Sequence, residues 1–239
     1  MMFFKNRKKD YEILKIFKIV GIDEAKGFKT KYCLNLILDF FEIFYNNLPD
    51  NFDINYGKKE WNSLKNFKKQ IIKYNDEYIF NLNGYFSSSS SKFSLSNNIL
   101  NSKNKDISYI KITIVMDKKF INEEKTLNLI KEIYKFFKFD YAYGLNLNEG
   151  YDFDSEKKIN KSFFGLFHSV SITKEDLEEE NRKVDFKNGY MKKIYPFNII
   201  NENQLSYINQ NIKINYHLSK FNDQLYILRQ DSSIDQVKK

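Results

Sequence analysis

Residues 107–116, ISYIKITIVM, are the most strand-like stretch of this 239-residue chain. Apolar side chains fall on both alternations, because Ile112 and Ile114 share one face while Tyr109 and Val115 share the other. A strand with two apolar faces is covered on both sides, which is typical of the centre of a sheet. We therefore predict a central strand here, with other elements packed on each face.

Two amphipathic helices are predicted around this strand. The segment 123–138 repeats apolar residues at helical spacing and follows Asn122, a good N-cap, with two acids in its first turn. The segment 30–48 carries an i, i+4, i+7 apolar stripe that includes Cys33, and Pro49 ends it. Each helix has one apolar face that needs a sheet or a second helix to cover it.

Shorter patterns predict the elements between and before these helices. We expect a helix over 59–75, a strand over 78–86 and a Ser/Asn/Lys-rich surface loop over 87–106. Residues 11–20 fit either a helix or a strand. Their charges recur every three residues, but their β-branched and aromatic content suits a strand.

The C-terminal part mixes short helices and strands. A strand is expected over 162–172 with His168 on its apolar face, as a core histidine, and capping-box spacing predicts a polar helix over 174–183. Further elements are a short helix near 202–210, a strand at 224–229 and a helix after Ser232. Because helices and strands do not alternate regularly and no period repeats, we predict an α+β class, with a mixed or antiparallel central sheet in one domain over 1–239.

The composition excludes several classes of protein. Aromatic residues make up 17% of the chain, too much apolar mass for a disordered protein. One cysteine and two histidines exclude a disulfide framework, a cysteine-based zinc site and a His-rich metal centre. Cys33 is expected to be a small buried hydrophobe, and His217 is assigned no role. No segment resembles a signal peptide or a membrane span, so we expect a cytoplasmic protein without a membrane partner.

The net charge of +8 does not by itself indicate a nucleic-acid partner. The chain has 36 Lys but 3 Arg and 2 Ala, a skew typical of AT-rich coding sequence, whereas phosphate and base recognition favours Arg. Residues 149–185 hold ten acids and six bases, a local charge of −4, so the rest of the chain sums to +12. An acidic patch with interleaved aromatics suits a basic partner. A solvated charged face and a basic nucleic-acid-binding module remain alternatives.

A metal-dependent nuclease is another alternative. Nucleases of restriction-endonuclease type place Asp/Glu-x-Lys on a strand near a second acid, so that two carboxylates hold the metal. Asp117 with Lys119 follows the predicted central strand, and Asp152, Glu156 and Lys158 form a second set. In a chain with so many acids and lysines about five such pairs are expected by chance, so this pattern has low specificity.

The order of elements resembles a known family of proteins. An apolar helix ending in Leu48-Pro49, Trp61, a strand with Gly84, the central strand and its following helix lead to a Tyr195-Pro196-Phe197-Asn198 stretch. This layout is similar to the immunity proteins of bacterial polymorphic toxin systems, in particular the immunity protein 52 group and its α+β relatives. The resemblance implies a non-catalytic protein that binds and blocks a cognate toxin, often a nuclease, inside the producing cell. Immunity proteins against nucleases are commonly acidic overall, and the charge of +8 departs from that pattern.

We therefore expect a toxin-binding immunity protein with no catalytic residues, no metal and no cofactor. The partner surface is predicted on the loop 141–156 and the helix 174–183. Its candidate residues are Tyr143, Tyr151, Asp152, Phe153, Asp154, Glu156, Glu175, Glu178 and Glu179.

Overall fold

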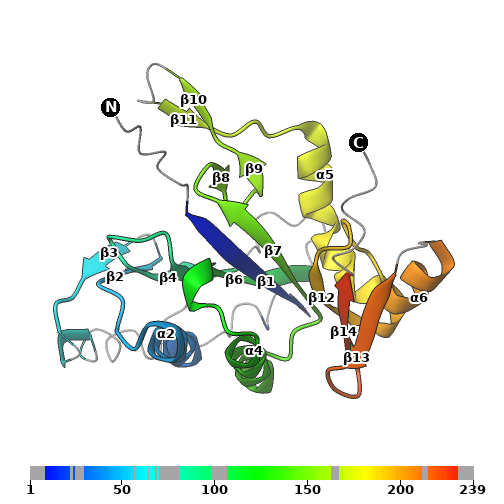
Figure 1. Cartoon of the computed structure of the whole chain (residues 1–239), viewed down its shortest axis with the longest axis horizontal. Helices are drawn as coiled ribbons and strands as arrows, with labels where there is room; N and C mark the ends of the chain where they lie inside the picture. Colours follow the sequence, from blue (N-terminus) through cyan, green and yellow to red (C-terminus); the bar gives the residue numbers. More distant parts are fainter. Residues whose placement is uncertain are drawn as a thin grey trace, which may run out of the picture.

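A ten-stranded antiparallel sheet forms the centre of the molecule (Figure 1). The computed structural model describes residues 9–21, 24, 30–55, 57–63, 65–67, 69, 81–97, 107–162, 167–211 and 215–230. Across the sheet the strands are β13 (Tyr216–Lys220), β14 (Leu225–Gln230), β12 (Phe197–Asn201), β7 (Tyr141–Asn148), β1 (Asp10–Gly21), β6 (Ile107–Asp117), β5 (Lys92–Asn97), β4 (Asn81–Tyr85), β2 (Asn51–Ile54) and β3 (Gly57–Glu60). The structure is a large antiparallel sheet with several helices, which agrees in part with the predicted α+β class, because the sheet dominates and the helices are few.

The central position of β6 is confirmed. It pairs with β1 over eleven positions, from Tyr11 opposite Asp117 to Gly21 opposite Ile107, and with β5 on its other side. The ambiguous segment 11–20 belongs to β1, because its long pairings with β6 and β7 place Leu14 and Ile16 on one buried face. Pairing with two neighbouring strands therefore identifies 11–20 as a strand, which the sequence periodicity alone left open.

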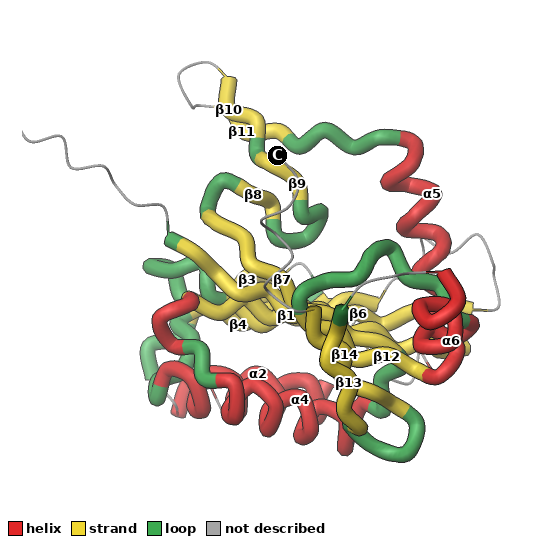
Figure 2. The backbone as a smooth tube through the Cα atoms, turned by 45° about the vertical axis from the view of Figure 1, so that its right-hand side comes forward, coloured by secondary structure: helices red, strands yellow, loops and turns green. Residues whose placement is uncertain are grey.

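Two helices cover one face of the sheet (Figure 2). They are α2 (Thr30–Tyr45) and α4 (Glu123–Phe137), both predicted. The N-cap of α4 is Asn122, whose side chain accepts a hydrogen bond from the backbone N–H of Lys125. Apolar side chains of both helices are buried against the strands, among them Phe40, Phe41, Ile130 and Ile133. Cys33 falls within α2, but its side chain lies outside the described part of the chain.

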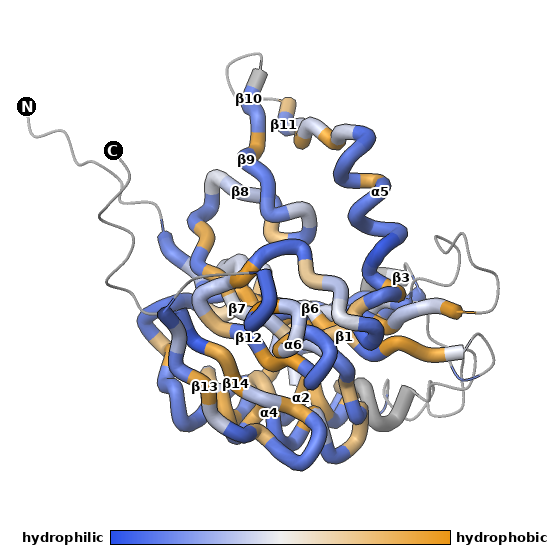
Figure 3. The backbone as a smooth tube through the Cα atoms, turned by 90° about the vertical axis from the view of Figure 1, so that its right-hand side faces the viewer, coloured by the Kyte–Doolittle hydropathy of each residue, from blue (hydrophilic) through white to orange (hydrophobic). Residues whose placement is uncertain are grey.

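The opposite face of the sheet carries an aromatic layer. Phe17, Tyr109 and Tyr141 lie on this face, and Phe186 packs edge-on against Phe17 with ring centroids 4.9 Å apart. Phe186 belongs to the 3₁₀-helix η3 (Lys183–Asn188), which follows the helix α5 (Lys174–Arg182). The hydrophobic segments in Figure 3 therefore gather in the sheet and in the elements packed on it, whereas α5 is mostly hydrophilic.

Two expectations about the middle of the chain are only partly confirmed. The predicted helix 59–75 overlaps β3, which pairs with β2, and helical residues are described only at 65–67 and 69. The predicted loop 87–106 contains β5, which joins β4 to β6. The segment Lys92–Asn97 alternates buried Phe93 and Leu95 with serines, so a Ser/Asn-rich composition concealed a half-buried strand.

The segment 162–172, predicted as one strand, also differs from the expectation. The structure has two short strands, β10 (Asn160–Ser162) and β11 (Phe167–Ser169), which pair with each other and not with the large sheet. His168 in β11 is exposed, because this hairpin stands away from the core (Figure 1). The assignment of His168 as a core histidine is therefore wrong.

The C-terminal elements follow the expected order. The helix α6 (Glu202–Asn211) and strand β14 correspond to the predicted 202–210 and 224–229, and His217 lies on β13 at an end of the sheet. The helix expected after Ser232 lies outside the described residues. In the part of the chain that the structure describes, none of the helices is long and apolar enough to cross a membrane.

Candidate partner-binding surface

A projecting arm extends from the sheet face opposite α2 and α4 (Figures 1 and 2). We define the arm as residues 160–162 and 167–182, which contain β10, β11 and α5. Ahead of it, β8 (Tyr151–Asp152) and β9 (Lys157–Lys158) form a small hairpin around an acidic turn, residues 151–156. The arm and the acidic turn hold eight of the nine predicted partner residues.

The arm presents three large apolar side chains to solvent. Phe167 is 63% exposed, Ile172 65% and Leu177 58%. They are three of the eight large hydrophobic residues that are exposed in the described parts of the chain, and they fall within eleven positions. Exposed hydrophobic residues concentrated on one projecting segment indicate an interaction surface more strongly than scattered ones do.

The N-terminus of α5 is held by a complete capping box. The Asp176 carboxylate accepts hydrogen bonds from the backbone N–H and the hydroxyl of Thr173, at 2.6 and 2.8 Å, and forms an ion pair with Lys157. Thr173 in turn accepts a hydrogen bond from the backbone N–H of Asp176 at 3.3 Å. The hydrogen bond from Lys157 and those from Thr173 lower the pKa of Asp176. The arm is thereby fixed to the β8–β9 hairpin at this end.

Two acidic residues of α5 are exposed to solvent, and two others form ion pairs with the rest of the molecule. Glu175 and Glu178 are exposed, and Glu178 lies 3.7 Å from Lys174 one turn earlier. Glu179 instead forms an ion pair with Lys192 at 2.8 Å, and Glu180 contacts Lys183 and the hydroxyl of Tyr109. Of the predicted acids on this helix, Glu175 and Glu178 thus face solvent, whereas Glu179 helps to hold α5 to the body.

The acidic turn is folded back onto the sheet. The Asp152 carboxylate accepts hydrogen bonds from the backbone and hydroxyl of Ser155, at 2.8 and 2.5 Å, and the ring of Phe153 packs against Tyr11 with centroids 5.4 Å apart. Tyr151 and Phe153 are each partly exposed. These contacts leave Tyr151, Asp152 and Phe153 at the surface but in fixed positions.

Asp154 bridges two lysines of the sheet. Its carboxylate oxygens lie 3.4 Å from Lys92 on β5 and 3.5 Å from Lys111 on β6. Partial burial alone would raise the pKa of Asp154, but Lys111 and Lys92 outweigh it and hold the pKa at about 2. The Asp154 carboxylate therefore belongs to an internal cluster of charges, although about half of its side chain is accessible to solvent.

Glu156 is the centre of a buried polar cluster. Its side chain is 7% exposed, and its two oxygens lie 2.9 Å from Lys15 Nζ, 2.6 Å from Tyr143 Oη and 3.0 Å from Tyr195 Oη. The two tyrosine rings stack with centroids 3.8 Å apart. Glu156 also adopts a left-handed backbone conformation, with φ of +61°, an uncommon state for a residue with a side chain.

Burial is the main cause of the pKa shifts of Lys15 and Tyr143 in this cluster. Burial lowers the pKa of Lys15 to about 8, although Glu156 opposes the shift, and it raises the pKa of Tyr143 well above its usual value. Tyr143 and Glu156 were predicted to contact a partner, and their burial leaves neither side chain at the surface. They position the acidic turn instead, which corrects that part of the prediction.

The carboxylates of the nuclease hypothesis are engaged elsewhere. Asp117 caps η2 (Lys118–Phe120) by accepting a hydrogen bond from the backbone of Lys119 at 3.1 Å, and Asp152 and Glu156 have the partners given above. Among the described residues, no group of three or more His, Cys, Asp or Glu side chains is arranged to hold a metal ion.

The lysines that neutralise the acidic turn were not among the predicted site residues. Lys15 and Lys111 face the aromatic layer, and Lys15 shares the alternation of buried Ile13 and Phe17. A lysine on the apolar alternation of a strand is a detectable signal, because burial of its ammonium requires a partner carboxylate. Its partner could not be identified, since Glu156 lies 141 positions away.

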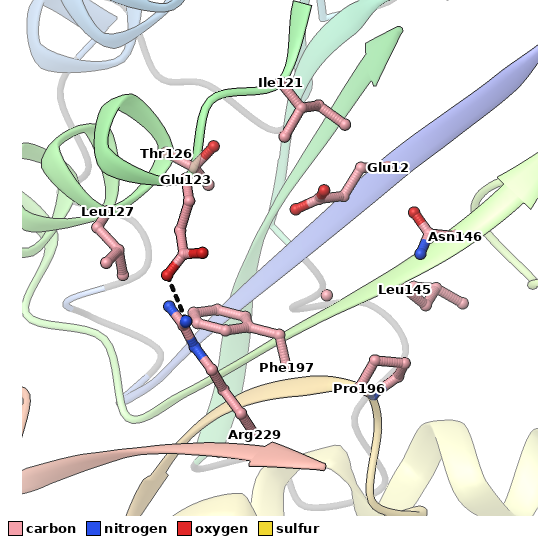
Figure 4. Close-up of a pocket in the computed structure, with 11 residues that line it drawn as sticks. Glu12, Ile121, Glu123, Thr126, Leu127, Leu145, Asn146, Pro196, Phe197 and Arg229 are labelled. Atoms are coloured by element: carbon pink, nitrogen blue, oxygen red, sulfur yellow. Dashed lines mark ion pairs between the residues drawn. The ribbon is translucent and has the colours of Figure 1, made fainter. Parts of the chain in front are cut away.

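A separate pocket lies on the helix-covered side of the sheet (Figure 4). It encloses about 290 Å³ between the start of α4 and the strands β1, β7, β12 and β14. Its lining residues are Glu12, Ile121, Glu123, Thr126, Leu127, Gly144, Leu145, Asn146, Pro196, Phe197 and Arg229. None of these residues was predicted as part of a site.

Comparisons with known proteins reveal similarity at the level of the fold. No family model and no curated protein matches the chain. A solved structure, the Pseudomonas aeruginosa T6SS protein PA0821, is similar with a TM-score of 0.53 and 9% sequence identity. The match covers 92% of this chain and 65% of the length of that protein. At this identity the similarity concerns the arrangement of the backbone.

Proposed function

We propose that this chain is a non-catalytic immunity protein that binds a cognate bacterial toxin and blocks its active surface. The observation that carries the proposal is the arm, which exposes three large apolar side chains and the acids Glu175 and Glu178 within twelve positions of the chain. An apolar centre with a charged rim is the usual composition of a protein-binding surface. The partner is expected to present a basic, partly apolar face.

The energetics of the arm favour a protein partner. Fully burying an exposed large aliphatic side chain contributes about 1.5–3 kcal/mol. Ile172 and Leu177 are 65% and 58% exposed, so burying them in a complex contributes part of its affinity, against the entropic cost of association. The acids contribute mainly to the rate of association and to the choice of partner. A capped, ion-paired α5 presents these groups with little loss of conformational entropy on binding.

Two further observations are consistent with a role in competition between bacteria. The fold resembles that of a T6SS protein, and the order of sequence elements resembles immunity proteins of polymorphic toxin systems. The T6SS (type VI secretion system) assignment belongs to that neighbour, and we extend it to this chain as part of the proposal.

The proposal is tested first by reading the neighbouring genes for a secreted protein with a toxin domain at its C-terminus, and the toxin domain found there is the binding partner in the assay. The toxin is expressed in a bacterial host with and without the chain, and the affinity of the two purified proteins is measured by titration calorimetry. We expect protection of the host and a stable complex. The double variant Ile172→Ser/Leu177→Ser should weaken binding at least about tenfold, given the apolar area involved.

A matched control replaces an exposed hydrophobic residue away from the arm. Phe136→Ser on α4 changes a side chain that is 56% exposed and should leave binding and protection unchanged. Equal losses for both variants, or no complex with the parental chain, would contradict the proposal. Cleavage of DNA or RNA by the purified chain in magnesium or manganese would contradict its non-catalytic part.

A further inference from the structure

The pocket of Figure 4 contains a carboxylate that no described residue binds. Glu12 lies on β1, on the face that α4 covers, and it is partly buried. Among the residues that the structure describes, none donates a hydrogen bond to its carboxylate or forms an ion pair with it. Burial accordingly raises the pKa of Glu12, and Lys118 opposes this from a distance. A partly buried carboxylate without a partner is costly to keep ionised.

The other charged groups of the pocket already neutralise each other. Arg229 on β14 forms an ion pair with Glu123 at the start of α4, and its guanidinium lies 5.8 Å from the centre of the Phe197 ring. Glu12 is therefore left as the net negative charge among the residues that line the cavity. An anionic ligand would be repelled by Glu12, whereas a cation would gain a partly desolvated partner.

Apolar side chains form most of the remaining wall. Ile121 and Leu127 border the space from the side of α4, and Pro196 and Phe197 border it from the side of β12 (Figure 4). Phe197 can pack this closely because residue 144 is glycine, where an added Cβ would lie 3.3 Å from the Phe197 ring. A volume of about 290 Å³ is at the lower end of ligand pockets, which span roughly 300–1,000 Å³. A short alkyl chain fits such a space.

We propose that this pocket binds an alkylammonium or alkylguanidinium group, whose charge pairs with Glu12 and whose carbon chain lies against the wall around Phe197. The group can belong to a free small amine or to a Lys or Arg side chain of another protein. The pocket and the arm are on opposite faces of the sheet, so this binding does not depend on the proposed toxin complex.

The test uses the purified chain alone. Uniformly labelled protein is titrated with n-butylguanidinium, n-butylammonium and, as the neutral control, n-butanol, while amide and side-chain NMR shifts are recorded. A second series uses a capped Gly-Gly-Arg-Gly-Gly peptide and its citrulline counterpart, which lacks the charge. We expect the cationic compounds to shift signals of Leu127, Leu145 and Phe197 and to lower the pKa of the Glu12 carboxyl.

Two variants separate the pocket from general surface charge. Glu12→Gln keeps the size of the side chain and should weaken cation binding at least about tenfold, since a charge-assisted contact is lost. Glu124→Gln removes an exposed acid from the first turn of α4 outside the pocket and should bind as the parental chain does. Circular dichroism and the melting temperature report whether each variant remains folded.

The outcomes distinguish the possible sources of the cation. Stronger binding of the free alkyl cations indicates a small amine, and stronger binding of the Arg peptide indicates a protein side chain. Either result supports the proposal when the matching neutral control, n-butanol or the citrulline peptide, fails to bind. Equal binding of n-butanol and n-butylguanidinium, unchanged binding by Glu12→Gln, or no shifts at the pocket with any cation would overturn it.

Discussion

The ammonium nitrogen of Lys15 lies 2.9 Å from a carboxylate oxygen of Glu156, 141 positions later in the chain, and both side chains are almost fully buried. The contact joins β1 in the centre of the sheet to the acidic turn at the base of the arm. Lys15 also donates a hydrogen bond of 2.6 Å to the backbone oxygen of Asp154 in the same turn. An internal ion pair therefore holds the acidic turn against the sheet.

Removing one charge of this pair should destabilise the protein strongly. Glu156→Gln leaves Lys15 buried without a counter-charge, and we expect a loss of about 3–5 kcal/mol in the free energy of unfolding, measured by urea denaturation. The double variant Lys15→Met/Glu156→Gln removes both charges and should recover part of that loss. A double variant less stable than Glu156→Gln would contradict this account. Asp223→Asn, in an exposed pair with Lys220, should have little effect.

The acid stability of the chain should depend partly on Asp154. Because its pKa of about 2 in the folded protein is below the usual 3.8, its stabilising effect is present above pH 4 and is lost as the pH falls toward 2. The half-exposed carboxylate limits this contribution to about 1 kcal/mol. Unfolding free energies measured between pH 5 and 2 should fall less steeply for Asp154→Asn. An unchanged slope would show that Lys92 and Lys111 do not stabilise the ionised form.

Gly84 should be required for the close approach of α2 to the sheet. A Cβ at this position would lie 2.6 Å from Ile37 Cγ2 and 3.3 Å from the Phe41 ring, so Gly84→Ala must displace the helix or its side chains. We expect a loss of about 1–3 kcal/mol, typical of overpacking, in thermal or urea unfolding. Gly21→Ala, where nothing lies within 4 Å of the added Cβ, is the matched control and should be tolerated.

The capping box should control the order of α5. Thr173→Ala removes the side-chain acceptor for the backbone N–H of Asp176, at a cost of about 1 kcal/mol. Hydrogen exchange of amides in Glu175–Arg182 should become faster, whereas exchange in α4 should not change. Thr173→Ser keeps the hydroxyl and should exchange at the parental rate. Faster exchange in both variants would assign the effect to packing of the methyl group instead.

Local patterns were sufficient for the elements whose neighbours along the chain determine them. The apolar repeat of α4, its Asn122 cap and the Thr173–Asp176 box each depend on residues within a few positions, and all three are present in the structure. The two-sided apolar pattern likewise predicted β6 as a central strand. Local patterns did not predict β5, because its composition is serine-rich and only its pairing with β4 and β6 identifies it as a strand.

The sequence by itself determined the α+β class, the central strand, the two helices that cover one face of the sheet, and the acidic character of residues 149–185. These properties follow from periodicity, capping and charge, which act over short distances along the chain. Only the tertiary structure decided that Tyr143 and Glu156 are buried while Glu175 and Glu178 are exposed, and that Glu12 lies in a pocket with Phe197 and Arg229. Burial and ion pairing depend on contacts between residues far apart in the sequence, so residue types and spacing alone could not reveal them.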